Sequence, residues 1–263
     1  NTFNVDDVGY ASAAAAGLTG GSITPTGASV GTKQGFSIVS YSGATNATTD
    51  SSTNSGNPWT IPHGLGQKPA FMIFKNRSAH GWYIYHQSLG ATKHLLLNTA
   101  TAEATETVLF RDTEPTSDFI NVGGWDVINR NSNNYISYIW HDVPGLQKFG
   151  KYFGNSNVDG PFIELGFRPA LLIVRRLEDA DNQWVIFDSK RDPFNNGTTA
   201  RYIRSPDAGA EGTANKLDFL SNGFKWRKAD SYTNDSGSST GFIYMAWAEA
   251  PTVNLFGGGA NAR

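Results

Sequence analysis

The sequence contains no cysteine among its 263 residues and only two methionines. The absence of cysteine excludes a disulfide framework, a thiolate zinc site and a cysteine nucleophile. Charged residues make up 17% of the chain, below the roughly 25% that is typical of soluble domains. The 21 basic and 23 acidic residues give a formal net charge of −2. This balance argues against a nucleic-acid-binding surface, because phosphate backbones require clustered positive charge.

Long apolar segments are also missing. No run approaches the roughly 20 residues needed to cross a bilayer, so we expect no membrane insertion. No cationic, apolar signal peptide begins the chain. The first residue is Asn1 and not Met, from which we expect a processed form or an excerpt of a longer protein.

Aromatic residues and glycine are abundant, with 29 Gly, 16 Phe, 10 Tyr and 7 Trp. Aromatic and β-branched side chains fit the half-buried face of a pleated sheet, so this composition favours an all-β protein. Short apolar runs are separated by Gly, Asn and Ser clusters at the spacing of an antiparallel sandwich. A helical pattern is indicated only around residues 6–17.

The two halves of the chain repeat one another. Residues 65–74 and 165–174 share the pattern Leu-Gly-x-(Lys/Arg)-Pro-Ala followed by four apolar residues. Further along, residues 82–85 match 184–187, and residues 135–144 match 242–251. A looser match relates residues 36–43 to 149–154. Four blocks in the same order indicate two copies of one β module.

From this repeat we predict two tandem, duplicated antiparallel β-sandwich modules, jelly-roll-like, over residues 36–145 and 146–251. Residues 1–35 are predicted to form an extended N-terminal arm or linker, because residues 11–35 are mostly Ala, Gly, Ser and Thr. A flexible linker and an arm that lies along a neighbouring subunit remain alternatives. Residues 252–263 are predicted to be a solvated C-terminal tail.

Histidines and acidic residues give no clear site. The spacing of the histidines does not match a zinc helix, and all five lie in the first module: His63, His80, His86, His94 and His141. Residues 129–133 and 179–182 resemble a calcium loop only distantly, without its full carboxylate series. We therefore predict no metal ion and no cofactor.

Catalytic motifs are also missing. The sequence has no Gly-x-Ser-x-Gly elbow, no phosphate-binding loop and no dinucleotide-binding glycine pattern. Glycoside hydrolysis requires two carboxylates that flank a sugar. Four acidic residues near predicted strand ends are conceivable members of such a pair, but the sequence does not pair them: Asp142, Glu164, Asp188 and Glu249. We predict that the protein is not an enzyme and has no catalytic residues.

Three tryptophans are the strongest remaining candidates for binding. Trp59, Trp125 and Trp226 lie beside polar or Gly-rich stretches. An exposed tryptophan can stack on the apolar face of a sugar or anchor a protein contact. We predict these three as ligand-binding residues; the alternative is that each closes the end of a sandwich.

An ordered set of short segments runs through nearly the whole chain. It consists of Gly35-Phe36-Ser37-Ile38-Val39-x-Tyr41-x-Gly43, His63-Gly64-Leu65-Gly66, Lys75-Asn76-Arg77, Trp82, Tyr85-His86, Asn98, Ser221-Asn222-Gly223-Phe224-Lys225, Tyr244-Met245-Ala246-Trp247-Ala248-Glu249 and Asn261-Ala262-Arg263. Over residues 5–263 the sequence resembles the duplicated C-terminal β region of tail-fibre or appendage virion proteins of marine tailed bacteriophages.

The resemblance implies a non-enzymatic structural protein of a phage virion, a tail-fibre or appendage module that contacts the host cell surface. Expected partners are other virion proteins, further copies of the chain as a homotrimer, and a host surface glycan. The expected location is the virion, on a tail appendage or the outer capsid surface. Two alternatives stay open: a capsid decoration protein that stabilises the shell, and a depolymerase of surface polysaccharide.

Overall fold

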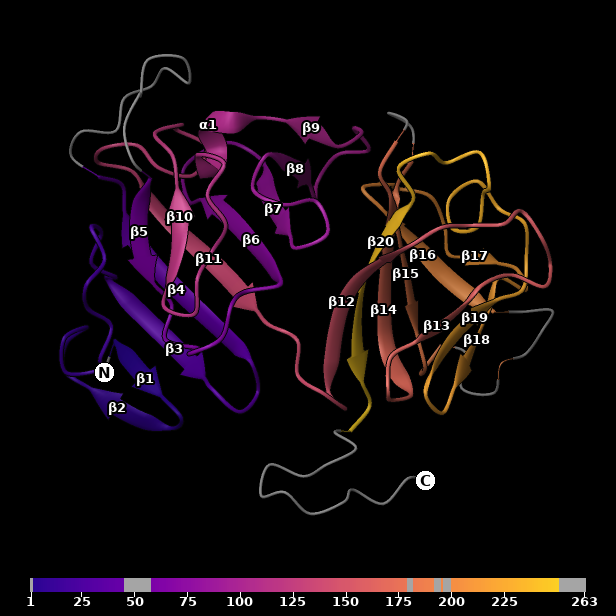
Figure 1. The fold of residues 1–263 in the computed structure, drawn as a ribbon, viewed down its shortest axis with the longest axis horizontal. Helices are drawn as coiled ribbons and strands as arrows, with labels where there is room; N and C mark the ends of the chain where they lie inside the picture. The colour runs from indigo at the N-terminus through magenta and orange to yellow at the C-terminus, as the bar shows by residue number, and fades with distance from the viewer. Residues whose placement is uncertain (1, 45–57, 179–181, 192–194, 196–199, 251–263) are drawn as a thin grey trace. The chain divides into compact units, whose positions relative to one another are not determined.

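The computed structural model describes residues 2–44, 58–178, 182–191, 195 and 200–250. The chain divides into two compact units, one of residues 1–96 and 104–141 and one of residues 97–103 and 142–263 (Figure 1). The single helix in the described ranges, α1 (Thr107–Phe110), has four residues. No helix there has the length and apolarity of a membrane span. Every other regular element is a strand, so the prediction of an all-β fold is confirmed.

The first unit contains a nine-stranded sheet, antiparallel except for the parallel pair β1–β3. Its order is β2-β1-β3-β4-β11-β6-β7-β8-β9. In that order the strands span Val8–Tyr10, Phe3–Val5, Gly27–Gly31, Phe36–Ser42, Asn134–Trp140, Phe71–Asn76, Trp82–His86, Lys93–Leu96 and Ala104–Thr105.

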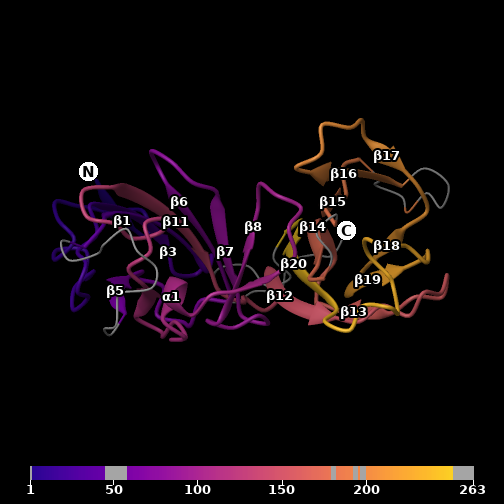
Figure 2. The same ribbon diagram turned by 90° about the horizontal axis from the view of Figure 1, so that it is seen from above.

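A two-stranded ribbon forms the second layer of the first unit. It pairs β5 (Trp59–Pro62) with β10 (Phe119–Val122) in antiparallel register. In Figure 2, β5 and α1 lie on one side of β3 and β11. Alternate residues of β4 are buried, as the period of a strand requires. Tyr41 of β4 and Ile120 of β10 belong to one core between the layers.

The second unit has the same two-layer construction. Its larger sheet has the order β12-β20-β14-β15-β16-β17, with strands at Gln147–Tyr152, Phe242–Ala248, Pro169–Arg176, Trp184–Asp188, Arg201–Ser205 and Gly212–Thr213. Its smaller sheet has the order β13-β19-β18, with strands at Phe162–Glu164, Gly223–Trp226 and Leu217–Leu220. All pairings in both sheets are antiparallel.

The larger sheets of the two units share one strand order. The run β4-β11-β6-β7-β8-β9 in the first unit corresponds, strand for strand along the chain, to β12-β20-β14-β15-β16-β17 in the second. The central strand β11 or β20 is in each case the last strand of its unit in the sequence. The duplication remains a prediction. Two copies of one module would have the same strand order, as these two sheets do.

A buried tyrosine in each unit occupies an equivalent position. Tyr41 of β4 donates its hydroxyl to the carbonyl of Ile128 at 2.6 Å, and Tyr152 of β12 donates to the carbonyl of Thr233 at 2.6 Å. Each tyrosine thereby connects its own strand, β4 or β12, to the loop that precedes the last strand of the unit. Burial raises the pKa of both phenols well above 10, so the hydroxyls remain donors.

A buried asparagine completes this connection in each unit. Asn129 accepts the amide of Ala44 at 2.8 Å, and Asn234 accepts the amide of Asn155 at 2.8 Å. Their side-chain NH2 groups donate to carbonyls of their own loops, at 2.9 and 3.0 Å. Both side chains are 0% exposed. We call each tyrosine–asparagine pair a loop latch.

The N-terminal segment differs from the expectation. Residues 1–35 were expected as an arm or linker, but β1, β2 and β3 are strands of the first sheet. Leu18, Ile23 and Val30 are buried in the first core, which explains why the segment folds back on its own unit. The expected helix around residues 6–17 is also absent from the described chain there, which contains β2 and turns.

The unit boundaries also shift. The division falls after residue 141, where the repeat placed it after 145, and residues 97–103 belong with the second unit. Arg175 fixes that segment there, because its guanidinium donates to the carbonyls of Ala100 and Thr101 at 2.7 and 2.5 Å. The predicted tail, 252–263, lies outside the described residues.

Candidate functional site

Trp226 cannot bind a surface ligand. Its side chain is 0% exposed and belongs to the core of the second unit. Its ring lies 5.6 Å from that of Phe224 and 5.8 Å from that of Phe187. The alternative from the sequence, a tryptophan that fills the sandwich, holds for this residue.

Trp59 and Trp125 are only partly buried, and both pack against the first core. The ring of Trp125 meets those of Tyr83 and His94 edge-on, at 5.7 and 6.1 Å. Trp59 begins β5 and pairs with Val122. The two tryptophans stay candidates for contact through their exposed edges, but neither lines the pocket described next.

The first unit has an open pocket of about 360 Å³ at the far end of β5 from Trp59. This volume falls within the range of small-molecule sites, about 300–1,000 Å³. Three stretches of chain line it: Gly17, Leu18 and Thr19; Pro62, Gly64 and Gly66; and Ser117, Asp118 and Phe119.

Its walls combine one aromatic ring, one carboxylate and several small polar groups. Asp118, Ser117 and Thr19 are exposed, and Phe119 is half-buried. Ser117 donates its hydroxyl to Asp118 Oδ2 at 3.1 Å. Gly17 and Gly66 both have a positive φ, of 74° and 67°, and a Cβ at either would meet no other atom within 4 Å. Glycine suits the positive φ that these two turns require, and no side chain at either position extends into the open space beside it.

A buried histidine connects two of these walls. His63 is 0% exposed and its Nε2 lies 3.2 Å from the carbonyl of Thr116. Its Nδ1 accepts the amide of Leu65 at 3.2 Å, and its own amide donates to the carbonyl of Asp118 at 3.2 Å. Burial lowers the pKa of His63 to about 4. The ring is therefore neutral near pH 7, with its proton on Nε2.

No cue in the sequence singled out this pocket. The sequence offers His63 only as one of five histidines without metal-site spacing and as part of the segment His63-Gly64-Leu65-Gly66, and it predicts residues 17–19 to belong to an arm or linker. The apolar Leu18 next to the glycine turn was the available signal, since a solvated linker has no reason to carry it.

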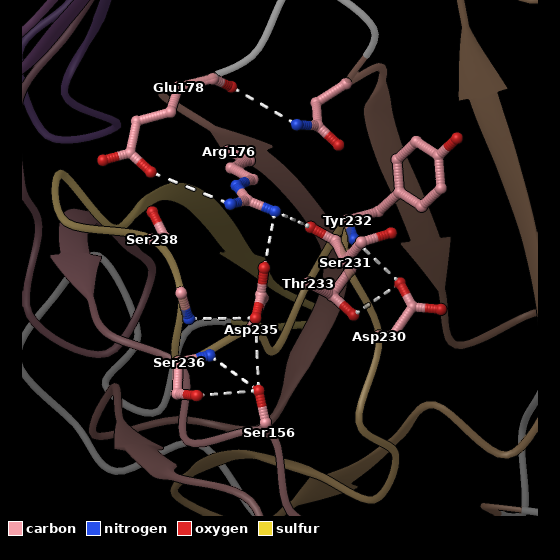
Figure 3. Close-up of polar contacts among 12 residues, drawn as sticks. Ser156, Arg176, Glu178, Asp230, Ser231, Tyr232, Thr233, Asp235, Ser236 and Ser238 are labelled. Carbon is pink, nitrogen blue, oxygen red and sulfur yellow. Dashed lines mark hydrogen bonds and ion pairs between the residues drawn. The ribbon is translucent and has the colours of Figure 1, made fainter.

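A polar network holds one end of the second unit (Figure 3). Arg176, at the end of β14, donates to the carboxylate of Asp235 at 2.7 Å and to the carbonyl of Ser231 at 3.1 Å. Glu178 lies 3.8 Å from the other side of the guanidinium. The amide of Gly237 and, to a smaller extent, Arg176 lower the pKa of Asp235.

This network has a structural counterpart in the first unit. Asn76 ends β6 as Arg176 ends β14, and its amide donates to the carbonyl of Asp126 in the corresponding loop, at 3.1 Å. Both side chains therefore hold the loop before the last strand. The serines around Arg176 have no histidine in their own unit to activate them, so we interpret the network as structural.

Three of the four carboxylates considered for glycoside hydrolysis are held in other roles. Asp142 accepts a backbone amide at 2.8 Å, and Asp188 pairs with Arg191 at 2.8 Å. Glu249 pairs with Lys190, which lowers the pKa of Glu249. A general acid requires a shift in the opposite direction. Glu164, at the end of β13, has its carbonyl engaged by Lys148.

The residues considered for metal binding do not converge. Within the described ranges no three His, Asp or Glu side chains are close enough together to hold an ion. The side-chain amide of Asn129 is engaged in the hydrogen bonds of the loop latch. Residues 179–181, part of the second calcium-like stretch, lie outside the described residues.

Comparison with known proteins places the chain in a family. No curated protein and no solved structure matched it. The model of one family matches residues 8–251, which include both units almost completely. The chain belongs to that family, which is described as a domain of unknown function (DUF7483).

Proposed function

We propose that this chain is a non-enzymatic module of a tailed-phage virion appendage, and that it contacts the host cell surface through the pocket of the first unit. The sequence resemblance to tail-fibre and appendage proteins supports the virion context. The observation that carries the contact site is the pocket of about 360 Å³ lined by Phe119, Asp118 and Ser117.

The position of the pocket relative to the repeat supports this assignment. The loop latches and the strand order are common to both units, as expected for groups that serve folding. The pocket is instead lined by residues 17–19, which precede the first repeated block. Two of its walls are connected by His63, whose counterpart at the repeat offset of 100 is Ile163. A feature confined to one copy is a better candidate for a specific function than one that both copies share.

The two alternatives receive less support. A capsid decoration protein that grips its neighbours needs a free N-terminal arm, and residues 3–31 carry β1, β2 and β3 of the first sheet. A depolymerase needs two convergent carboxylates with separated pKa values. Three of the four candidates, Asp142, Asp188 and Glu249, are occupied by cations or backbone amides.

Cryo-electron microscopy of the intact virion tests the proposal. We expect density for the chain at the end of a tail appendage, arranged with three-fold symmetry as a homotrimer. Density spread over the capsid lattice would overturn the proposal and favour a shell-stabilising role. Light scattering of the purified chain measures the oligomeric state independently.

A further inference from the structure

We propose that the pocket of the first unit binds one or two units of a neutral pyranose glycan and discriminates against anionic sugars. This inference names the ligand class for the site of the proposed function and rests on it. It follows from three properties of the pocket: its charge, its aromatic wall and the rigidity of its loops.

The charge of the pocket selects against anions. Asp118 is the only charged residue that lines it, and no lysine or arginine does so among the described residues. A carboxylate or phosphate on a ligand would therefore meet a like charge without a compensating cation. Neutral sugar hydroxyls, in contrast, donate to carboxylate oxygens in charge-assisted hydrogen bonds. Ser117 and Thr19 add hydroxyl groups that can donate or accept.

The aromatic wall suits the apolar face of a pyranose ring. Phe119 lines the pocket and is half-buried. A Cβ added at Gly20 would lie 3.3 Å from its Cζ, so the chain at Gly20 backs the ring on one side. A supported aromatic ring beside a carboxylate offers both an apolar surface and a hydroxyl acceptor. The combination matches the two chemical faces of a neutral sugar.

The pocket loops are preorganised by hydrogen bonds. Thr116 Oγ1 accepts the amides of Asp118 and Phe119 at 3.2 and 3.0 Å. His63 connects this loop to the opposite wall through Thr116 and Asp118, and the amide of Leu18 is held by the carbonyl of Ala13 at 2.9 Å. A ligand would therefore pay little ordering entropy on binding.

The experiment measures binding of defined sugars to the full chain. The probes are the methyl pyranosides of glucose, galactose and mannose, the disaccharide maltose, and two anionic sugars, methyl glucuronide and N-acetylneuraminic acid. Saturation-transfer and protein-observed NMR report binding. We expect at least one neutral probe to bind with a Kd of about 1–10 mM, which is ordinary for a ligand of this size. Anionic probes are expected to bind at least about tenfold more weakly.

Variants locate the site. Asp118→Ala is expected to weaken neutral-sugar binding at least about tenfold, and Asp118→Asn, which keeps the shape, by about threefold to tenfold. Phe119→Leu, which keeps an apolar side chain, is expected to weaken it at least about fivefold. Asp7→Asn is the matched control, because Asp7 is an exposed acid in a separate pocket of the same unit. The backbone NMR spectrum verifies that each variant is folded.

Three results would overturn the inference: no neutral probe binds at about 100 mM, ten times the upper end of the expected Kd range, an anionic probe binds more tightly, or Asp118→Ala and Phe119→Leu bind like the parent. With the chain at a tail appendage, the first two results remove only the ligand class, whereas the third also removes the pocket as the contact site and leaves the appendage role. A capsid-lattice location removes the proposed function whatever the sugars do.

Discussion

Between pH 7 and pH 5 the first unit is expected to lose about 2 kcal/mol of stability because His63 becomes protonated on unfolding. His63→Gln is expected to remove this part of the pH-dependent loss. The pKa of His63 is about 4 in the folded chain and 6.5 in the reference state. Because the folded pKa is lowered, the unfolded chain takes up the proton first as the pH falls. The stabilisation by neutral His63 is therefore complete above about pH 6.5 and is lost progressively toward pH 4.

The magnitude follows from the two pKa values. A difference of 2.5 units, 6.5 minus 4, corresponds to about 3 kcal/mol in the limit of low pH, at 1.36 kcal/mol per unit. About 2 kcal/mol of this is lost by pH 5. Burial also lowers the pKa of His94, so His94 contributes a loss of the same sign in both proteins. The difference between parent and variant isolates His63.

The assay is urea unfolding at pH 7, 6 and 5, followed by pulsed hydrogen exchange and mass spectrometry of peptides from β4, β6 and β11. This readout follows the first unit separately. The parent is expected to lose more stability than His63→Gln over this range. Equal losses, or an NMR titration of the parent that places the pKa of His63 near 6.5, would refute the reasoning.

Four further substitutions test contacts inside the individual units. Asn129→Ala and Asn234→Ala are each expected to destabilise their own unit by about 2–4 kcal/mol, because each removes the hydrogen bonds of a fully buried side-chain amide and leaves a cavity; unit-resolved urea unfolding measures both, and a change below about 0.5 kcal/mol contradicts the loop latch. Arg176→Met is expected to cost the second unit about 2–3 kcal/mol, since it leaves Asp235 without its cation; thermal unfolding measures the cost, and an unchanged midpoint contradicts it. Gly154→Ala is expected to cost at least about 3 kcal/mol, because a Cβ there would lie 2.4 Å from the amide nitrogen of Asp235; a folded variant of parental stability contradicts the close approach.

Strand positions were the most predictable part of the fold. The apolar block that follows Leu165 forms β14, and the block around Trp82 forms β7. These runs are read correctly because burial dictates their composition and the period of a strand is fixed at two. Strand order was not predictable in this way, since periodicity gives no information about which strands pair.

The N-terminal segment shows where composition misleads. Small residues such as those of β3, Gly27–Gly31, are typical of a linker, yet they also suit a strand that packs closely on its neighbour. A few apolar side chains decide between the two, and Leu18 and Val30 are buried. These side chains contact residues that are distant in the sequence, so the composition of a short segment does not indicate that they are buried.

Polar residues of the two units also form a common structure, which the matching of sequence blocks did not predict. The matched blocks are mainly apolar, and the loop latch adds a hydrogen-bond pattern that both units have. Tyr41 and Asn129 form it in the first unit, and Tyr152 and Asn234 form it in the second. The offsets explain why this was hard to see. The tyrosines are 111 residues apart and the asparagines 105, so the correspondence that the predicted duplication implies is not visible at a single offset.

The departures from the repeat are where specific chemistry is available. At the position of His63 the second unit has Ile163, and there the amide of Leu165 pairs with the carbonyl of Asn222 instead of a histidine nitrogen. Among the described residues, the second sheet begins with β12 and has no strands equivalent to β1, β2 and β3. In that part of the chain the N-terminal segment that lines the pocket therefore has no counterpart in the second unit. If binding depends on that segment, shortening the chain before β3 should abolish it while the second unit keeps its unfolding midpoint.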